Sequence, residues 1–574
     1  MYILGISKGH DASVALIKDG KIIFNCQEER LVGIKHSYAV PVHALELCFK
    51  TTGTSIKDID YISVPIVGKI PDITLLFHAK ESHTVSLSSQ TNSTADLARK
   101  LILNSLGYLN IFNRFGYPLY QKTYPLTKKT EILQVDHHAS HAASAYYSSG
   151  FEKCLAVTAD GVGAGLSLTA WLGEKGNLTP LIKIWRPGSL GFFYEIVTEA
   201  LGWQVGEGEG KTMGLAPYGS TKKIKGVLDF LAPRYKDGKL VKPVNFGIAT
   251  RWDVNGSTHF SYAISRRVKK LVDIYGPENI AAEAQRVLEE QMLNFIVPWI
   301  KKTNVRHVAA AGGVFLNVKM NQHLWETNLL DDFYPHADPG DGGNAAGAAL
   351  YAYHAYLKKP YKPKRIENTY WGPAYTDEYI KQQLDIRNLS YTKIQNKKSL
   401  VSLAAKLLSE GKIVGWLQGK LESGPRALGN RSILMDPRRA ENKDIINARV
   451  KYREGFRPFC PSMTDKAAKK YLMNSTKAEF MTISFNVPKD VQKDIPAVVH
   501  IDGTARPQVL KRFVNPLYYD LISEFGKLTG VPVLLNTSFN IKGMPIVCTP
   551  SDAIKCFYDT GLDYLIIGSF VLKK

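Results

Sequence analysis

The sequence predicts an α/β protein with two domains, and three observations support this prediction. With 574 residues, the chain is too long for one hydrophobic core. Short apolar runs that end in glycine-rich loops alternate with segments of helical periodicity along the chain. A stretch rich in proline and charge at 358–374 interrupts this alternation. We therefore expect a first domain at 1–360, a linker at 361–374 and a second, α+β domain at 375–574.

The N-terminal stretch predicts three strands joined by a glycine loop and a tight turn. The turn, Asp19-Gly20, lies between two apolar runs, which is a strong hairpin signal. The glycine loop before it carries polar groups, among them His10, as the first hairpin of actin-like ATPases does. The first domain is thus expected to be actin-like, of the RNase H-like (ASKHA) ATPase type, with two subdomains. A helix is expected at 39–52, whereas residues 68–125 are poorly periodic and predict no function.

Two histidines four residues apart, His137 and His141, stand in an alanine-rich segment that predicts a helix. Positions i and i+4 share one helix face, so both rings can reach one cation, and neutral imidazole is a common metal ligand. Asp160 and Asp341 each follow a short apolar run and precede glycine, as expected for loops at strand ends. The four side chains predict a metal site, and the alternative is a pair of surface histidines.

Glycine-rich turns surround these aspartates. Residues 308–317 predict a strand, a glycine pair and a helix, and the turn at 340–344 repeats this pattern. Glycine lets a backbone approach a nucleotide closely, and a helix N-terminus favours phosphate. The residues expected to bind nucleotide or phosphate are Gly161, Gly163, Gly312, Gly313, Asn317, Gly342 and Gly343.

Residues 206–219 include Gly210-Lys211-Thr212, which looks like the end of a Walker A loop. That motif requires a glycine at position 205, where this chain has Val205, so we exclude a P-loop. Lys211 remains either a phosphate contact or part of a plain glycine-rich turn.

The second half predicts a helix at 400–410 and a strand at 412–417, followed by a dense polar loop at 418–432. So many polar groups between strands are costly to bury without a ligand. At 451–459 three cations alternate with aromatic residues, and on a strand this alternation would point all three to one face. A buried strand at 532–535 then leads into hydroxyl and amide groups.

The composition limits the partners. Lys and Arg exceed Asp and Glu by 73 − 52 = +21, which favours anionic partners such as nucleotides, acyl phosphates or nucleic acid, although a solvated basic surface explains it equally well. Apart from the short run at 451–459, the sequence shows no basic stripe interleaved with aromatics, which argues against nucleic acid. No apolar run approaches the ~20 residues of a membrane span, so no membrane partner is expected. The six cysteines form no CxxC pair, which suits a reducing, cytoplasmic location.

The motifs together resemble the NodU/TobZ-type O-carbamoyltransferases over nearly the whole chain. They are GHDAS at 9–13, HHASHAASA at 137–145, GLAPYG at 214–219, GDGG at 340–343, GPRALGNRS at 424–432, REGFRPF at 453–459 and LNTSFN at 535–540. In that family an actin-like domain similar to TsaD precedes a YrdC-like domain. The KxR and SxN motifs of YrdC-like domains match Lys451-Tyr452-Arg453 and Ser538-Phe539-Asn540. Lys420 stands where arginine is often found, which puts a bidentate contact there in doubt.

The resemblance implies two reactions. The YrdC-like domain would join ATP, with Mg²⁺, and carbamoyl phosphate into carbamoyl-adenylate, and the actin-like domain would pass the carbamoyl group to a hydroxyl of a small molecule. The implied metal is Fe(II) or a similar divalent ion on His137, His141, Asp160 and Asp341. The residues expected at carbamoyl phosphate and ATP are Gln418, Arg426, Arg431, Lys451, Arg453, Arg457, Asn536, Ser538 and Asn540.

Two basic residues of the first domain are expected to be catalytic. His10 could take the proton of the alcohol. Alternatively, it could orient the substrate or make a contact within a turn. Lys35 could grip the phosphate of the adenylate, or else be a surface lysine. Because carbamoyl-adenylate is labile and the linker is short, we expect the cationic pocket to pack against the actin-like cleft, with an internal path.

Three alternatives are weighed, and a homodimer is left open. A fused threonylcarbamoyl-adenosine synthase acting on tRNA would suit the positive charge, but the order of motifs matches the small-molecule enzymes. A HypF-like carbamoylator of a protein cysteine would carry paired CxxC motifs, which the sequence lacks. A non-catalytic actin-like sensor should have lost the metal set or KxR, and both are present.

Overall fold

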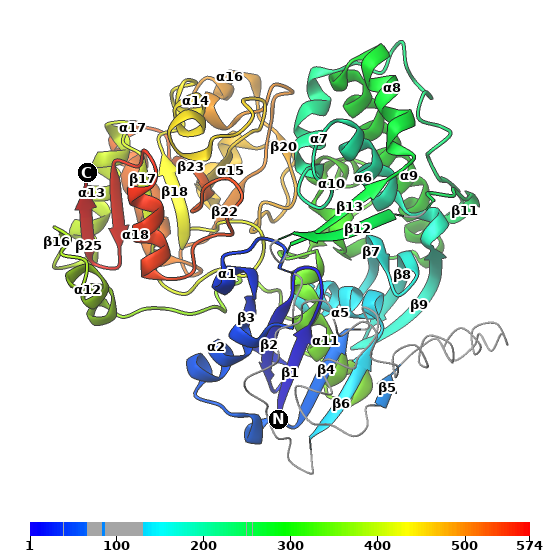
Figure 1. Cartoon of the computed structure of the whole chain (residues 1–574), viewed down its shortest axis with the longest axis horizontal. Coiled ribbons are helices and arrows are strands. Elements are labelled where there is room, and N and C mark those ends of the chain that lie inside the picture. The colour runs from blue at the N-terminus through cyan, green and yellow to red at the C-terminus, as the bar shows by residue number, and fades with distance from the viewer. Residues whose placement is uncertain (38–39, 66–82, 86–129, 248, 255–256) are drawn as a thin grey trace.

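The first 360 residues form two β-sheets with helices between and beside them (Figure 1). The computed structural model describes residues 1–37, 40–65, 83–85, 130–247, 249–254 and 257–574. Most of the aperiodic stretch 68–125 lies outside the described residues. The predicted N-terminal helix begins at Val42, after Pro41, and is α2 (Val42–Thr52).

The first sheet begins with the predicted hairpins. Its strand order is β3-β2-β1-β4-β6-β5, with β1 to β3 antiparallel and the last three strands parallel to β1. Asp19 and Gly20 both have positive φ, 49° and 77°, as a tight hairpin turn of the predicted kind requires. The strands are β1 (Tyr2–Ser7), β2 (Ser13–Lys18), β3 (Lys21–Gln27), β4 (Tyr61–Pro65), β5 (His83–Val85) and β6 (Glu131–Val135).

The second sheet repeats the connectivity of the first. Its order is β15-β14-β7-β8-β9, in which an antiparallel meander of three strands is extended from its first strand by parallel strands. The strands are β7 (Lys153–Gly163), β8 (Leu166–Glu174), β9 (Asn177–Trp185), β14 (His307–Ala311) and β15 (Asp332–Pro335). Each sheet thus consists of an antiparallel meander with parallel strands added beside its first strand.

Two helices rich in small residues lie between the sheets. Helix α11 (Asn344–Tyr351) packs on the first sheet, α5 (His137–Ser149) packs on the second, and the two helices pack on each other. Their backbones approach so closely that a Cβ at Gly347 would lie 2.1 Å from the carbonyl oxygen of Ser140. This contact fixes the spacing of the two helix N-termini, where two parts of the site begin.

A helical layer packs beside the second sheet. It includes α9 (Pro277–Thr303), whose core face contains Leu288 and Phe295. The segment 206–219 is not a plain turn, because it contains α7 (Glu209–Leu215). The other helices of this layer are α6 (Leu190–Ala200), α8 (Ser265–Tyr275) and α10 (Val318–Trp325).

The second domain is built on one eight-stranded mixed sheet. Its order is β16-β25-β24-β17-β18-β23-β19-β22, and α13 (Lys397–Ser409) packs with α17 (Pro516–Thr529) in a core around Trp416. The predicted helix at 400–410 and strands at 412–417 and 532–535 are present. The strands are β16 (Thr392–Lys393), β17 (Val414–Leu417), β18 (Arg431–Met435), β19 (Cys460–Thr464), β22 (Gln508–Leu510), β23 (Val533–Ser538), β24 (Tyr564–Ile567) and β25 (Phe570–Lys573).

The prediction of a strand at 451–459 is wrong. Lys451 ends a π-helical turn, Asn447–Lys451, and Tyr452 has a left-handed backbone with φ 46°. Irregular chain follows as far as β19, and Pro458 within it lacks the N–H that a sheet would need. The three cations therefore come from a loop, not from one face of a strand.

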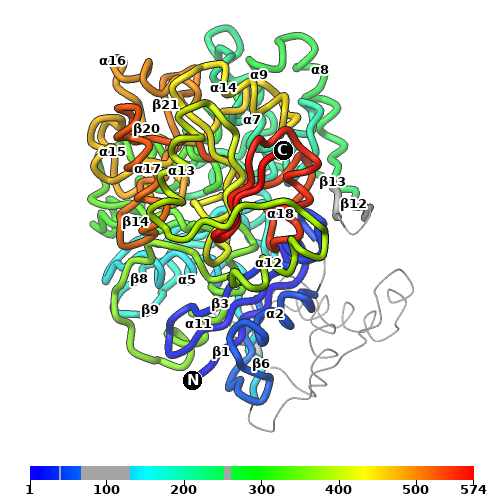
Figure 2. Tube along the Cα trace, turned by 90° about the vertical axis from the view of Figure 1, so that its left-hand side faces the viewer, coloured from blue at the N-terminus to red at the C-terminus, as the bar shows by residue number. Residues whose placement is uncertain are grey.

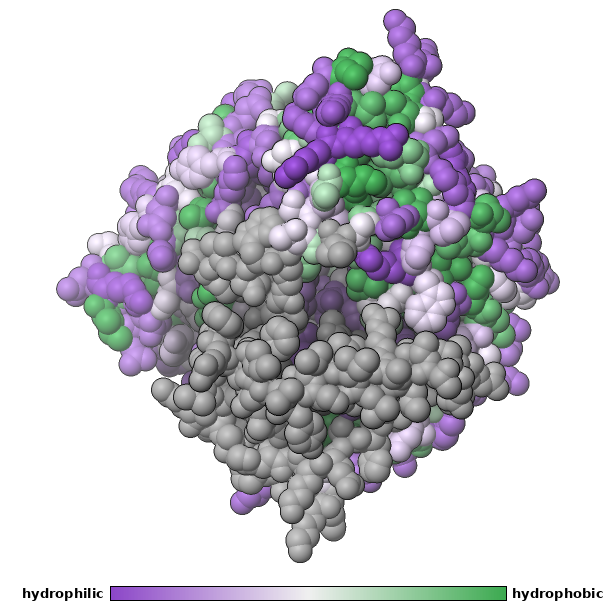
Figure 3. Space-filling model, turned by 45° about the vertical axis from the view of Figure 1, so that its right-hand side comes forward, coloured by the Kyte–Doolittle hydropathy of each residue, from purple (hydrophilic) through white to green (hydrophobic). Residues whose placement is uncertain are grey.

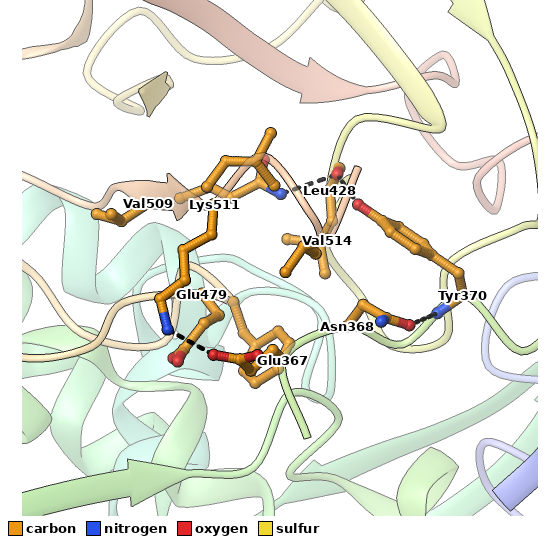
Figure 4. A pocket seen from close by; sticks show the side chains of 11 residues that line it. Glu367, Asn368, Tyr370, Leu428, Glu479, Val509, Lys511 and Val514 are labelled. Carbon is orange, nitrogen blue, oxygen red and sulfur yellow. Dashed lines mark hydrogen bonds and ion pairs between the residues drawn. The ribbon is translucent and has the colours of Figure 1, made fainter. Parts of the chain in front are cut away.

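The segment between the domains is held on both sides. The Arg365 guanidinium donates to both oxygens of Glu479 at 3.0 Å, lies 3.4 Å from Asp332 and stacks on Tyr334. Figure 4 shows a small cavity where the next residues meet the second domain, and there the Tyr370 hydroxyl donates to the Leu428 carbonyl at 2.8 Å. In Figure 2 the second domain lies directly against the first.

The described residues include no helix long and apolar enough to cross a membrane. On the face shown in Figure 3, hydrophilic and hydrophobic residues alternate in small areas on the coloured surface.

Candidate functional site

The predicted metal ligands converge at one point in the cleft. The Nε2 atoms of His137 and His141 lie 3.1 Å apart, and each is 3.2 Å from Oδ2 of Asp160. Oδ1 of Asp341 lies 3.4 Å from the first imidazole and 3.3 Å from the second. Ligands placed about 2.1 Å from one ion stand about 3.0–3.4 Å from their neighbours, so this set fits a metal ion without rearrangement.

Each ligand is positioned by a different element. His137 and His141 occupy the first turns of α5, whose N-cap Asp136 accepts from the Ala139 N–H at 2.9 Å. Asp160 lies in β7, and Asp341 begins the 3₁₀ turn that leads into α11. The close packing of α5 on α11 therefore sets the distance between the histidines and Asp341.

The charges of the ligands depend on one another. Burial alone would lower the pKa of His141, but hydrogen bonds to Asp160 and Asp341 raise it to about 9. Burial would raise the pKa of Asp160, but the two imidazoles hold it well below its usual range. Asn344, which the sequence did not single out, also lies here, with its amide nitrogen 3.1 Å from Nε2 of His141. Buried imidazoles and carboxylates of this kind suit a divalent transition metal.

The glycines predicted to face phosphate line this site, and packing explains two of them. A Cβ at Gly163 would lie 1.9 Å from the His137 ring, and a Cβ at Gly312 would lie 2.1 Å from the Ala159 carbonyl oxygen. A Cβ at Gly313 would lie 3.2 Å from Oδ1 of Asp160, which is a looser contact. The remaining members of the set, Gly161, Gly342 and Gly343, stand in the loops of Asp160 and Asp341, whereas Asn317 caps α10 by accepting from the Met320 N–H at 3.0 Å.

His10 stands at the same cleft and is paired with Asp11. Its Nδ1 lies 3.0 Å from Oδ2 of Asp11. Burial would lower the pKa of His10, but the charge and hydrogen bond of Asp11, with smaller contributions from Asp341 and Asp160, raise it to about 10. The predicted Lys35 lies 3.4 Å from Glu207, on the side of the cleft that faces the second domain.

The KxR and SxN motifs lie in contact with each other. The buried Lys451 ammonium donates to Oδ1 of Asn540 at 2.7 Å and to the Ser538 hydroxyl at 3.2 Å. Burial, together with the nearby Arg453, Arg457 and Lys35, holds the pKa of Lys451 well below its usual range. A lysine from the first domain thus acts electrostatically on the pocket of the second.

Several guanidinium groups surround this lysine. Burial and neighbouring guanidinium groups lower the pKa of Arg426 and of Arg453. Arg506, which the sequence analysis missed, contributes to both shifts and donates to the Cys460 sulfur from two nitrogens, at 3.1 and 2.9 Å. Arginine stays charged under ordinary conditions, so the cluster is a concentrated positive charge that favours a polyanion.

Three other residues of the second domain that were predicted to bind ligand form hydrogen bonds with groups of the protein. The fully buried Arg431 donates to backbone carbonyls, with Gln418 at 2.7 Å and Asn430 at 3.0 Å among them. The Gln418 amide donates to the Gly568 carbonyl, and the Asn536 amide donates to the Ser462 hydroxyl. They shape the polar loop and the sheet beneath the pocket.

The loop before Asp341 and the polar loop at 418–432 are linked through Gln27 and Arg30. Gln27 donates to Asp338, three residues before Asp341, at 3.0 Å. Arg30 donates to the same glutamine and to the carbonyl of Gly424 in the GPRALGNRS loop, at 2.7 Å. Fold and site therefore define an α/β protein in which a candidate metal centre lies near a cluster of buried cations.

The chain belongs to the carbamoyltransferase family and is an enzyme of that class. The model of the carbamoyltransferase N-terminus matches residues 2–350, and that of the C-terminus matches 405–574. Nodulation protein NolNO of Sinorhizobium fredii is 34% identical over 98% of this chain and 79% of its own length. Nodulation protein U of the same organism is 26% identical over 97% and 96%.

Two solved structures overlap part of the fold. HypF of T. kodakarensis is 17% identical, with a TM-score of 0.31 over 62% of this chain and 48% of its own. Component A of (R)-2-hydroxyglutaryl-CoA dehydratase from Acidaminococcus fermentans is 13% identical, with a TM-score of 0.32 over 62% and 99%. Overlaps this low define neither the fold nor the activity.

Proposed function

We propose that the chain is an ATP- and carbamoyl phosphate-dependent O-carbamoyltransferase that works through carbamoyl-adenylate. The observation that carries this proposal is the cluster of Lys451, Arg426, Arg453 and Arg457, which lie close enough for neighbouring charges to lower one another's pKa, with Lys451 donating to Ser538 and Asn540. Such a cluster is unfavourable without an anion, and ATP with carbamoyl phosphate supplies several negative charges. The pocket also stands next to Lys35 and the cleft of the first domain.

In the first reaction, the cations would bind the phosphates while Ser538 and Asn540 orient Lys451. Water would first cleave carbamoyl phosphate into carbamate and inorganic phosphate. A carbamate oxygen would then bond to the α-phosphorus of Mg²⁺-ATP, the bond from that phosphorus to the bridging oxygen of the β-phosphate would break, and pyrophosphate would leave. The mutual repulsion of the cations in the free pocket would be relieved once the phosphates bind. The polar loop around Gln418 and Arg431 would support this pocket from below.

In the second reaction, a hydroxyl of a small molecule would take the carbamoyl group in the first domain. His137, His141, Asp160 and Asp341 would hold Fe(II) or a similar ion, which as a Lewis acid would polarise carbonyl and phosphate oxygens. His10 would take the hydroxyl proton, and Lys35 would hold the phosphate of the arriving adenylate. The glycine turns beside Asp160 and Asp341 would let the nucleotide approach the backbone.

The domain assignment is part of the proposal. Two sheets of the same connectivity, with α5 and α11 between them, support an actin-like first domain at 1–360. The contact of KxR with SxN supports a YrdC-like second domain at 375–574. The segment 361–374, anchored near Arg365, would be the linker between them.

The test is carbamoyl phosphate-dependent release of pyrophosphate from ATP by the purified full-length chain, with acetyl phosphate and no acyl phosphate as controls. We expect release with carbamoyl phosphate, and a mass gain of one carbamoyl group on a hydroxylated acceptor from a panel of sugars and polyols. A parallel reaction with threonine, bicarbonate, ATP and tRNA examines the alternative. Modified tRNA without any carbamoyl phosphate-dependent release would refute the proposal.

A further inference from the structure

Asp11 lies between two imidazole rings and pairs with both. Its Oδ2 is 3.0 Å from Nδ1 of His10, and its Oδ1 is 2.7 Å from Nδ1 of His36. The two rings stack on each other, with centroids 4.8 Å apart and planes inclined by 14°. The carboxylate can accept from both rings only when each carries its proton on Nδ1. The arrangement therefore fixes the tautomer of His10.

The backbone is shaped to make this pairing. Asp11 and His36 both adopt left-handed conformations, with φ of 55° and 52°, which are uncommon for residues other than glycine. The N–H of His36 donates to Oε2 of Glu29 at 3.0 Å, which holds the residue in place. Two uncommon conformations at the two ends of one hydrogen bond indicate that the contact is built into the loops and is not incidental.

The Nε2 edge of His10 faces Gly206. Its Nε2 would lie 3.5 Å from a Cβ on Gly206, where there is no side chain. The His10 side chain is 32% exposed, whereas that of His36 is 19% exposed, so a substrate can reach the first ring more readily than the second. In the neutral ring Nε2 is the atom left to accept a proton, so His10 acts as a base at a pH where the ring is uncharged.

We propose that His36, acting through Asp11, is a positioning residue that keeps Nε2 of His10 free to accept the proton of the acceptor hydroxyl. This inference rests on the proposed function. The hydroxyl oxygen bonds to the carbamoyl carbon, its proton passes to Nε2, the bond from that carbon to the adenylate phosphate oxygen breaks, and AMP leaves. Asp11 balances the charge that His10 gains, and the proton then passes to solvent.

The charged and titratable groups around the pair come from several elements. Glu207 lies 3.9 Å from Nε2 of His36 and also contacts Lys35. The other groups are Glu29, Glu195, Glu209, Asp160 and Asp341. Loss of the His36 hydrogen bond leaves the Asp11 charge less compensated, which raises the pKa of His10 and makes it a base only at higher pH.

The test compares H36A with H36N in the full-length chain. Asparagine tolerates a left-handed backbone and its amide can donate to Asp11 as Nδ1 does, whereas alanine cannot. We expect H36A to lower kcat of carbamoyl transfer about 10- to 100-fold, the range typical for removing a partner that orients an imidazole. The KM for the acceptor should stay unchanged, and the acid limb of the pH profile should move to higher pH. H36N should restore both, and pyrophosphate release should match the wild type in both variants.

Three results would overturn the inference: equal loss in H36N and H36A, no loss in H36A, or a second metal ion per wild-type chain that H36A removes. The last would mean that His10, Asp11 and His36 form a metal site. If H36A does not fold, the carbamoyl-transfer rates of D11N and H36N are compared instead. Only D11N should lose carbamoyl transfer. Failure of the proposed function is a separate result, since the wild type would then release no carbamoyl phosphate-dependent pyrophosphate.

Discussion

Lys211 in α7 of the first domain lies 3.0 Å from Glu454 in the loop that follows KxR in the second. The pair is mostly shielded, with side chains 18% and 24% exposed. Phe456 of the same loop packs near Trp203, with ring centroids 5.9 Å apart. The loop that carries the cations therefore packs against the first domain. A movement of this loop would change the position of the cation cluster relative to the candidate metal site.

The first prediction concerns this joint. K211E or E454K should raise the amount of pyrophosphate released per carbamoylated product about 2- to 5-fold, because a partly shielded ion pair contributes roughly 1 kcal/mol and loss of closure exposes the intermediate to water. Parallel measurement of pyrophosphate and product checks this. The double variant, in which the charges are exchanged, should recover tight coupling. If the double variant releases as much pyrophosphate per product as the two single variants, electrostatic attraction between these residues does not hold the domains together.

The second prediction concerns the anion pocket. K451A and R453A should each abolish carbamoyl phosphate-dependent release of pyrophosphate, since each removes a cation from the cluster around the phosphates. Release is measured with a coupled phosphate assay. The control is K542A, because Lys542 is exposed in the loop just after SxN and loses the same side chain. Normal release by K451A would place the first reaction elsewhere.

The third prediction concerns the metal. H141A should remove the bound ion and stop carbamoyl transfer, while at least some release of pyrophosphate remains in the second domain. Elemental analysis and the two activities check this, with H323A on the surface of α10 as the matched control. Full metal content in H141A would contradict the assignment of the ligands.

The fourth prediction concerns pH. The folded state depresses the pKa of Lys451, so between that pKa and the ordinary value of 10.5 the unfolded chain binds more protons than the folded one. The free energy of unfolding of the wild type should therefore rise with pH relative to K451M, by at most about 1.4 kcal/mol per pH unit, up to pH 10.5. Below the folded-state pKa the difference should be constant. Chemical denaturation of both proteins at several pH values measures it, and a difference that falls with rising pH would exclude a depressed pKa.

The four residues of the candidate metal site could be singled out because their sequence signals are local. The spacing of His137 and His141 follows from the helix period, and an aspartate before glycine at the end of a buried strand marks a loop at a sheet edge. Their convergence depends on the packing of α5 on α11. Asn344 carried no such signal, because its role arises only where the start of α11 meets α5.

The cationic pocket was harder to predict in detail. Alternation at 451–459 suggested a strand, but Tyr452 turns left-handed and the same cations gather from a loop. Arg431 looked like a ligand residue, yet it donates to carbonyls that only the folded loop brings around it. Arg506 comes from a strand connection far along the chain, and no spacing in the sequence links it to Lys451.

The absence of a side chain at Gly347 has a consequence for how the enzyme can be damaged. A single added methyl group there would meet the Ser140 carbonyl and push apart two helices: α5, which carries His137 and His141, and α11, which directly follows the 3₁₀ turn of Asp341. Such a substitution changes none of the candidate metal ligands and no other chemically reactive side chain. The enzyme would lose activity because the distance between α5 and α11 had increased. A substitution of Gly347 by alanine is therefore chemically conservative but would have a severe effect on function.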